Sequence, residues 1–255
     1  MEIDSPSVVV PMHRTARALP ALLERLGASL PGAEVILVDD ACPERSADLA
    51  LTIDHRGLEV TTVRINPNVG QHAAVLIGMS QASRGITVVM DADLQDAPED
   101  VPMLIDHLRS SPDADAVCVA RSGRYTSLAR RLTAHAYRAV VTVMSRGRIP
   151  RNAGMFMVVR TEVLARIATL GDPFAPLVPA LCASGARIQA VALRRHARSD
   201  GASGYRGRMR LLVALRGLVL LTPARSLVAR RHRARFAQLA PTIVVERTQS
   251  GHCPG

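Results

Sequence analysis

The chain has 255 residues, of which 48% are hydrophobic and only 2% aromatic, so it can bury one sizeable aliphatic core. All 32 basic residues are arginines, and the formal net charge is +10. The charge is divided unevenly, because residues 1–120 hold 8 Arg against 18 acids and residues 121–255 hold 24 Arg against 4 acids. The excess of arginine in residues 121–255 predicts an anionic partner, which could be phosphate groups, an anionic membrane surface or nucleic acid.

Cysteine usage and hydropathy exclude several classes of protein. The cysteines are widely separated and form no C-x-x-C pair, which argues against a zinc site and against a disulfide framework. The acidic N-terminus lacks the basic-then-apolar order of a signal peptide, and no uncharged apolar stretch is long enough to span a bilayer. We therefore expect a cytoplasmic protein, with peripheral contact at the inner face of the cell membrane.

Strand-like and helix-like segments alternate through the first half of the chain. This alternation predicts an α/β fold with a mostly parallel sheet flanked by helices. The predicted strands are Ser7–Val10, Glu34–Val38, Leu58–Ile65, Ile86–Met90 and Ala116–Val119. The predicted helices are Leu19–Leu30, Glu44–Ile53, Gly70–Ser83 and Val101–Arg109.

The second half of the chain predicts fewer elements and a change of composition. A helix is expected over Ser127–Met144, and late strands over Met155–Val159 and Ile188–Leu193. The predicted domains are a catalytic domain over 1–200, an Arg-rich amphipathic helical appendage over 201–240 and a loose tail over 241–255. The apolar run Leu211–Leu221, flanked by arginines, suits either a helix lying in a membrane interface or a core helix with a solvated basic neighbour.

Polar residues follow five of the predicted strands, at the point where each strand ends. Ligands of open α/β sheets bind beyond the carboxyl ends of the strands, so these residues predict a ligand site at one edge. The residues are Pro11, Asp39–Asp40, Asn66–Gly70, Asp91–Gln95 and Arg121. The sequence contains no GxGxxG or P-loop motif, which disfavours a dehydrogenase or an NTPase.

Asp91 and Asp93 form the most informative of these strand ends. Two carboxylates one residue apart, directly after a buried strand, can converge on one hard cation. Oxygen ligands of this kind suit Mg²⁺ or Mn²⁺, which commonly hold a diphosphate at the same time. The alternative is an acidic loop that only caps the helix expected to begin at Pro98.

Four motifs in this order resemble the family 2 glycosyltransferases of the GT-A (Rossmann-like) fold. The likeness is to the branch that loads sugars onto polyprenyl phosphates, which includes dolichol-phosphate mannose synthase and undecaprenyl-phosphate sugar transferases. The motifs are Val35–Asp40, Asn68–Ala74, Met90–Gln95 and Arg198–Tyr205. The resemblance implies a metal-dependent, inverting enzyme that moves a sugar from a nucleoside diphosphate sugar to a polyprenyl phosphate.

The resemblance also implies a role for individual residues. Pro11, Asp40, Gln71 and Asp91 would bind the nucleotide sugar, with Asp40 accepting a hydrogen bond from the base. Asp91, Asp93 and Gln95 would hold Mg²⁺ or Mn²⁺. Arg121, Arg130 or Arg131, Ser203 and Tyr205 would bind the acceptor phosphate. Asp93, Arg121 and Arg198 would be the catalytic residues, with Arg198 near the phosphates of donor and acceptor. Planar Arg grips phosphate well, which agrees with these roles.

The chain departs from the family pattern at two places. Relatives carry Asp-x-Gly-Asp-Phe-Arg or a similar segment where this chain reads Asn152–Met157, and Pro-x-Tyr-Asn-Glu where it reads Pro11–Thr15. A soluble small-molecule acceptor, or an inactive homologue that binds a nucleotide sugar, are therefore the alternatives. A nucleic-acid binder leaves Asp91–Gln95 unexplained and offers few aromatics for base stacking, so no nucleic-acid partner is expected. His72, near the start of a helix, could touch the donor, but a histidine at such a position is more often structural.

Overall fold

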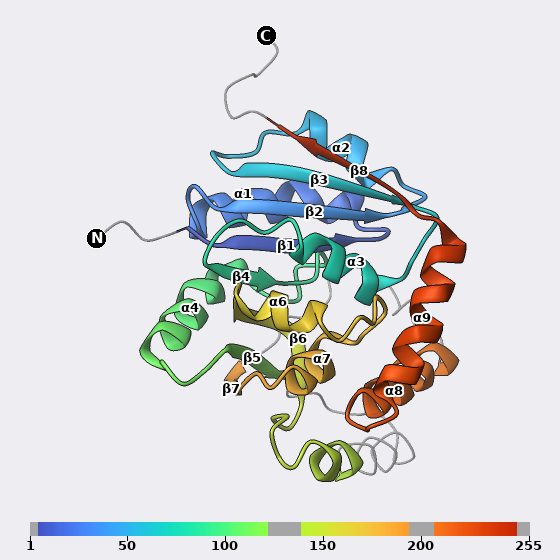
Figure 1. Cartoon of the computed structure of the whole chain (residues 1–255). Helices are drawn as coiled ribbons and strands as arrows, with labels where there is room; N and C mark the ends of the chain where they lie inside the picture. The colour runs from blue at the N-terminus through green and yellow to red at the C-terminus, as the bar shows by residue number, and fades with distance from the viewer. Residues whose placement is uncertain (1–4, 122–138, 194–206, 249–255) are drawn as a thin grey trace.

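Apolar, β-branched runs form one eight-stranded sheet in the computed structural model, which describes residues 5–121, 139–193 and 207–248 (Figure 1). The strand order is β7-β5-β6-β4-β1-β2-β3-β8. The strands are β1 (Ser7–Met12), β2 (Glu34–Asp40), β3 (Glu59–Asn66), β4 (Ile86–Val89), β5 (Ala116–Arg121), β6 (Ala153–Arg160), β7 (Ile188–Leu193) and β8 (Thr242–Arg247).

Most neighbouring strands run parallel, as the alternation of strands and helices predicts. The order β4-β1-β2-β3 is parallel throughout, and β5 is parallel to β7. Strand β6 is antiparallel to both β4 and β5, and β8 is antiparallel to β3. The chain therefore enters β6 at the same edge of the sheet at which β4 and β5 end.

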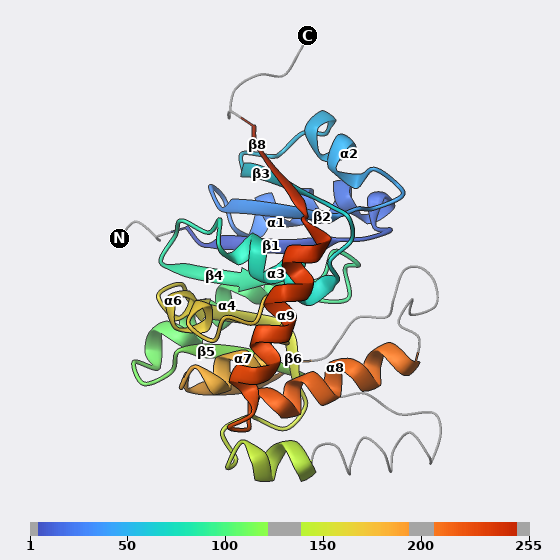
Figure 2. The same cartoon turned by 45° about the vertical axis from the view of Figure 1, so that its right-hand side comes forward.

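Helices cover both faces of the sheet, and each face has its own apolar core (Figures 1 and 2). On one face α1 packs through four leucines at helical spacing, alongside α4. The other face carries α3, α6, α7 and the C-terminal pair α8 and α9. The helices are α1 (Leu19–Ser29), α2 (Ser46–Thr52), α3 (Gln71–Met79), α4 (Val101–Ser110), α6 (Val163–Ala168), α7 (Leu177–Ala183), α8 (Gly207–Leu220) and α9 (Arg225–Leu239).

The C-terminal helices pack on the domain. Leu220 of α8 and Ala229 of α9 are buried, and Leu220 belongs to the core on the α3 face. Phe174, in the loop between α6 and α7, has the guanidinium groups of Arg216 and Arg235 at 5.6 and 5.7 Å from its ring centroid. These contacts join the predicted appendage to the body of the protein.

The C-terminal segment is a strand where the sequence predicts a loose tail over 241–255. Residues 242–247 form β8, which pairs with β3 from Thr61↔Arg247 to Asn66↔Thr242. Arg64 Nε donates to Glu246 Oε2 at 2.9 Å and strengthens this pairing. The β-branched run Ile243–Val245 fits an edge strand, and pairing satisfies the backbone groups that β3 would otherwise expose.

Residues 139–144 are helical and precede β6, which agrees with the end of the predicted helix Ser127–Met144. Residues 127–138 of that predicted helix lie outside the described residues. Among the residues that the structure describes, no helix has both the length and the apolar character needed to cross a membrane.

Helix α3 lies unusually close to the sheet at Gly78. A Cβ added there would stand 2.6 Å from Val38 Cγ2 and 2.7 Å from Val9 Cγ1. Glycine at this position lets α3 approach β1 and β2 closely, and the helix begins at the carboxyl edge of these strands.

We expect Gly78→Val to destabilise the protein by about 1–3 kcal/mol, because the added side chain overpacks the α3–sheet contact. Urea unfolding followed by circular dichroism measures the change. Gly85→Val is the matched control, since a Cβ there has nothing within 4 Å. Equal stability of the two variants would contradict the close contact.

Candidate active site

Four strand ends that the sequence singles out lie at the carboxyl edge of the sheet. Strand β1, which contains Pro11, lies between β2, which ends at Asp40, and β4, which is followed by Asp91. The loop from β3 to α3 reaches the same edge next to Asp40. The sequence prediction of one ligand edge thus agrees with the arrangement of the strands.

Asp40 holds this loop in place. Its side chain is 4% exposed, and its Oδ1 and Oδ2 accept hydrogen bonds from the amides of Val69 (2.7 Å) and Gly70 (2.8 Å). Asn68 Nδ2 donates to the Asp40 backbone oxygen at 2.7 Å. Burial raises the pKa of Asp40, and the amides of Val69 and Gly70 act in the opposite direction by favouring the charged form. The carboxylate therefore positions the start of α3, and hydrogen bonding to a nucleotide base stays a prediction.

Asp39 shapes the turn that follows β2. Its Oδ1 accepts from the Cys42 amide at 2.7 Å, and its Oδ2 accepts from the Ala47 amide at 3.0 Å, in the first turn of α2. These bonds use the side chain to hold the turn and the start of α2, so Asp39 faces the protein's own backbone.

Gln71 links two of the predicted motifs. It is the first residue of α3, and its Nε2 donates a hydrogen bond of 2.9 Å to Asp91 Oδ1. Gly70, just before it, has φ = 92°, a conformation that favours glycine and turns the chain from the loop into the helix. The chain of contacts therefore runs from Asp40 through Gly70 and Gln71 to the first aspartate of the Asp-x-Asp pair.

The Asp91–Gln95 segment forms a tight turn after β4. Asp93 Oδ1 accepts a hydrogen bond from the Gln95 amide at 3.2 Å, and Leu94 has φ = 58°. Ala92 is buried between the two aspartates, both of which are half-buried. No group of three or more His, Cys, Asp or Glu side chains within the described ranges could hold a metal. A metal at Asp91, Asp93 and Gln95 thus stays a prediction.

Of the predicted acceptor-binding residues, Arg121 lies within the described part of the chain. Arg121 ends β5, which runs parallel to β4, so its backbone reaches the ligand edge. Nothing is described of its side chain. Arg130, Arg131, Arg198, Ser203 and Tyr205 lie outside the described residues.

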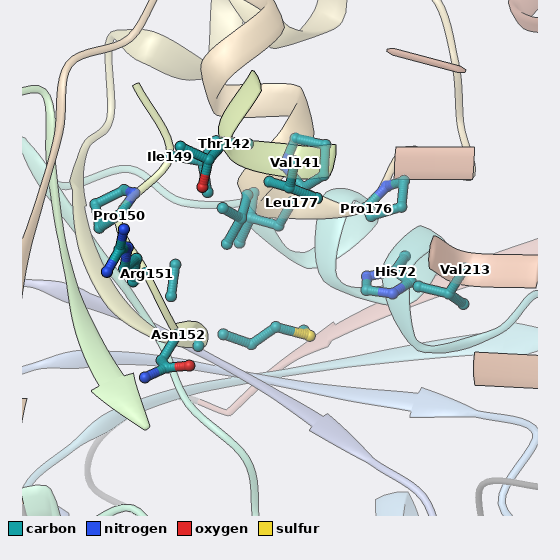
Figure 3. Close-up of a pocket in the computed structure, with 15 residues that line it drawn as sticks. His72, Val141, Thr142, Ile149, Pro150, Arg151, Asn152, Pro176, Leu177 and Val213 are labelled. Carbon is teal, nitrogen blue, oxygen red and sulfur yellow. The ribbon is translucent and has the colours of Figure 1, made fainter. Parts of the chain in front are cut away.

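A pocket of about 250 Å³ lies on the face of the sheet that carries α3 (Figure 3). Segment 139–144, the start of β6, α7 and α8 line it, together with His72 of α3. Figure 3 shows His72 and Val213 on one side of the pocket and Pro150 and Arg151 on the other. Asn152, with φ = 62°, belongs to the segment that departs from the family pattern, and this segment forms part of the pocket wall.

His72 carries a buried polar atom. Its Nδ1 has no hydrogen-bond partner among the residues that the structure describes. Burial, together with the charge of Arg216, lowers the pKa of His72 to about 4, so the imidazole is neutral at pH 7. A purely structural role for His72 does not explain why its buried Nδ1 lacks a hydrogen bond.

Residues 7–168 match the family model for glycosyl transferase family 2, which is more than half of the chain. The chain belongs to glycosyl transferase family 2. Its curated relatives include two proteins named undecaprenyl-phosphate 4-deoxy-4-formamido-L-arabinose transferase. The protein of Pseudomonas paraeruginosa is 41% identical over 134 residues, and that of Pectobacterium atrosepticum is 36% identical over 136 residues. Each match covers 51% of this chain but only 39% and 41% of the respective relative.

Two solved structures share the fold of the chain. Glucosyl-3-phosphoglycerate synthase from Mycobacterium tuberculosis, in complex with UDP, has a TM-score of 0.60 at 22% identity, over 84% of this chain and 79% of that one. A mannosyltransferase from Pyrobaculum calidifontis, in complex with GDP-Man and Mn²⁺, has a TM-score of 0.52 at 19% identity, over 98% and 77%. At these identities the likeness shows the GT-A fold, which confirms the predicted fold class.

We expect Asp40→Ala to destabilise the protein by about 2–4 kcal/mol, because the Val69 and Gly70 amides lose a charged acceptor inside the protein. Urea unfolding followed by circular dichroism measures the loss. Asp106→Ala, an exposed position on α4, is the control and should stay within about 0.5 kcal/mol of the unmodified chain. A similar small effect in Asp40→Ala would show that the loop does not depend on this carboxylate.

Proposed function

We propose that this chain transfers a sugar from a nucleoside diphosphate sugar to a polyprenyl phosphate. Family membership and the names of the two relatives support this proposal. The observation that carries it in the structure is the bond between Gln71 and Asp91, which brings two family motifs together at the ligand edge of the sheet.

Mg²⁺ or Mn²⁺ is part of the proposal. Asp91 and Asp93 offer carboxylate oxygens from one short turn, and Gln95 offers an amide oxygen, which are ligands that these metals prefer. The amide of Gln71 holds Asp91 in a fixed orientation. When bound, the metal offsets the charge that develops on the diphosphate leaving group.

Other residues of the chain bind the nucleotide and the acceptor phosphate in this proposal. Pro11 and Asp40 border the nucleotide, and Arg121, Arg198 and one of Arg130 or Arg131 hold the acceptor phosphate next to the donor, with Ser203 and Tyr205. A phosphate monoester has a second pKa near 6, so it is largely dianionic at neutral pH and needs no strong general base. The segment Asn152–Met157 contains no carboxylate that could act as a base, which is compatible with such a nucleophile. We propose that the transfer inverts the anomeric configuration.

Peripheral contact with an anionic membrane, at its cytoplasmic face, completes the proposal. Val143 is 76% exposed, and Leu212 and Leu215 of α8 are each 49% exposed. Exposed arginines of α9, among them Arg230 and Arg231, add positive charge to the same C-terminal helical pair. Apolar side chains next to arginines are typical of surfaces that bind anionic lipids.

We expect one nucleoside diphosphate sugar to bind in the presence of Mn²⁺ and the binding to weaken at least tenfold in Asp93→Ala and in Gln71→Ala. Isothermal titration calorimetry of a panel of donors, with and without Mn²⁺, measures this. Asp100→Ala and Gln81→Ala are the matched controls, from the next helix start and from beyond the end of α3, and should bind like the unmodified chain.

The donor that binds is then incubated with undecaprenyl phosphate. Sugar transfer to this lipid supports the full proposal. Donor binding without transfer to undecaprenyl phosphate contradicts the proposed acceptor. No donor binding with or without Mn²⁺ contradicts the transferase proposal.

A further inference from the structure

Strand β8 leaves one edge of the sheet open. It is the last strand in the sheet order, so within the described residues it pairs with β3 and with no strand on its other side (Figure 1). Its central run of Ile243, Val244 and Val245 is exposed at 42%, 44% and 40%. An exposed apolar edge strand is a template for pairing with another strand, and proteins usually prevent this with a charge, a proline or a bulge. The central run of β8 contains none of these.

The register with β3 fixes which backbone groups of β8 point out of the sheet. The Thr248 amide donates to the Val60 carbonyl at 3.0 Å, and the pairing continues from there without a shift. Because backbone direction alternates along an antiparallel strand, every second residue back from Thr248 bonds to β3, and the residues between them direct their N–H and C=O groups to the open edge. The β8 residues that face the open edge in this way are Ile243, Val245 and Arg247.

The order of side chains makes β8 complementary to a second copy of itself. Antiparallel pairing about a two-fold axis at Val244 places Val244 opposite its own copy and Ile243 opposite Val245. Every side chain of the apolar run then meets an apolar side chain. In the same register the outward backbone groups of Ile243 and Val245 donate to and accept from each other. Glu246 lies opposite Thr242, so no charge faces the apolar run.

Charge favours this register over its neighbours. A two-fold axis at Val245 would set Val244 opposite Glu246, and an axis at Glu246 would set two glutamates opposite each other, which is unfavourable. Within each copy, Arg64 donates to Glu246 at 2.9 Å and to Asp48 at 2.6 Å. The acidic groups beside the open edge are therefore paired with a cation and do not repel a second copy.

We propose that β8 is a homodimer interface, at which two copies of the chain join their sheets through antiparallel β8–β8 pairing about Val244. A second copy is the partner that the side chains favour, because one strand supplies both halves of an interface in which apolar groups meet apolar groups. The two-fold axis stands perpendicular to the sheet, so the faces that carry α3, α8 and α9 lie on the same side in both copies. The inference goes beyond the proposed function and does not depend on it.

Sedimentation velocity of the full chain over a range of concentrations, in about 150 mM salt to screen the net charge, tests the proposal. We expect a dimer whose population rises with concentration. Val244→Arg sets like charges opposite each other at the axis, and Val245→Pro removes an N–H that pairing with β3 does not use. Each variant should raise the dissociation constant of the dimer at least about tenfold.

Met103→Arg is the matched control for these variants. Met103 is 39% exposed on α4, which packs on β5 and β6, away from β8 in the sheet order. This variant should dimerise like the unmodified chain, and an equal loss of dimer would contradict the site. A monomer at every concentration up to about 100 μM would overturn the proposal, and so would a dimer that Val244→Arg and Val245→Pro leave unchanged. Circular dichroism and urea unfolding establish that each variant is folded.

A cross-link tests the register. Opposite residues of a non-hydrogen-bonded antiparallel pair have Cα atoms about 4.5 Å apart, within the range that a disulfide spans. Val244→Cys should therefore give a disulfide-linked dimer on mild oxidation, seen on a non-reducing gel and reversed by reduction. Glu246→Cys is the control and should not cross-link, because it faces Thr242 in this register, and the unmodified chain shows the background from its own cysteines. Cross-linking of Glu246→Cys but not of Val244→Cys would overturn pairing about Val244.

Discussion

The buried carboxylate of Asp40 accepts two backbone amides of the loop that leads into α3, and the arrangement of the candidate site depends on this contact. The loop begins where β3 ends, on the strand next to β2, so the two bonds join neighbouring strand ends. They place Gln71 against Asp91 on one side and His72 at the pocket on the other. Burying a carboxylate inside a protein costs free energy, and the hydrogen bonds from the two amides offset this cost.

The close approach of α3 to the sheet works together with that contact. Gly78 sets the depth at which the far end of α3 rests on β1 and β2, and Asp40 sets the position of its first residues. Because both ends are fixed, the first two side chains of the helix have different neighbours. Gln71 donates a hydrogen bond to Asp91, while His72 lines the pocket together with residues of β6, α7 and α8.

The sequence predicted the parallel strands well, because strands buried on both faces are continuous apolar runs such as Val35–Val38. It did not predict that β6 would run antiparallel between β4 and β5, since periodicity carries no information on strand order. Helices α6 and α7 are short, and Pro173, Pro176 and Pro179 hide their pattern. Strand β8 was missed for another reason: an edge strand exposed on both faces shows neither alternation nor a buried run.

The sequence predicts ligand roles for individual residues, but it does not predict their contacts within the protein. Asp40, Gln71 and Asp91 were predicted as ligand-binding residues, but only the structure shows that Asp40 and Gln71 also organise the protein itself. His72 was interpreted as structural because a single histidine near a helix start carries little signal. Its buried Nδ1 without a partner is a property of the tertiary structure, to which α7, β6 and α8 contribute residues distant in the chain.

Strand β8 has a consequence for the helices that precede it. Because the chain returns to the sheet after α9 and pairs there with β3, the C-terminal helical pair is anchored to the domain beyond its last residue. His232 and Asp172, joined at 2.7 Å, fix α9 a second time along its length. These contacts hold α8 and α9 against the sheet, so the two helices do not move independently of the domain. If α8 lies on a bilayer, it therefore fixes the tilt of the whole sheet, and with it the height of the Asp91 turn above the lipid.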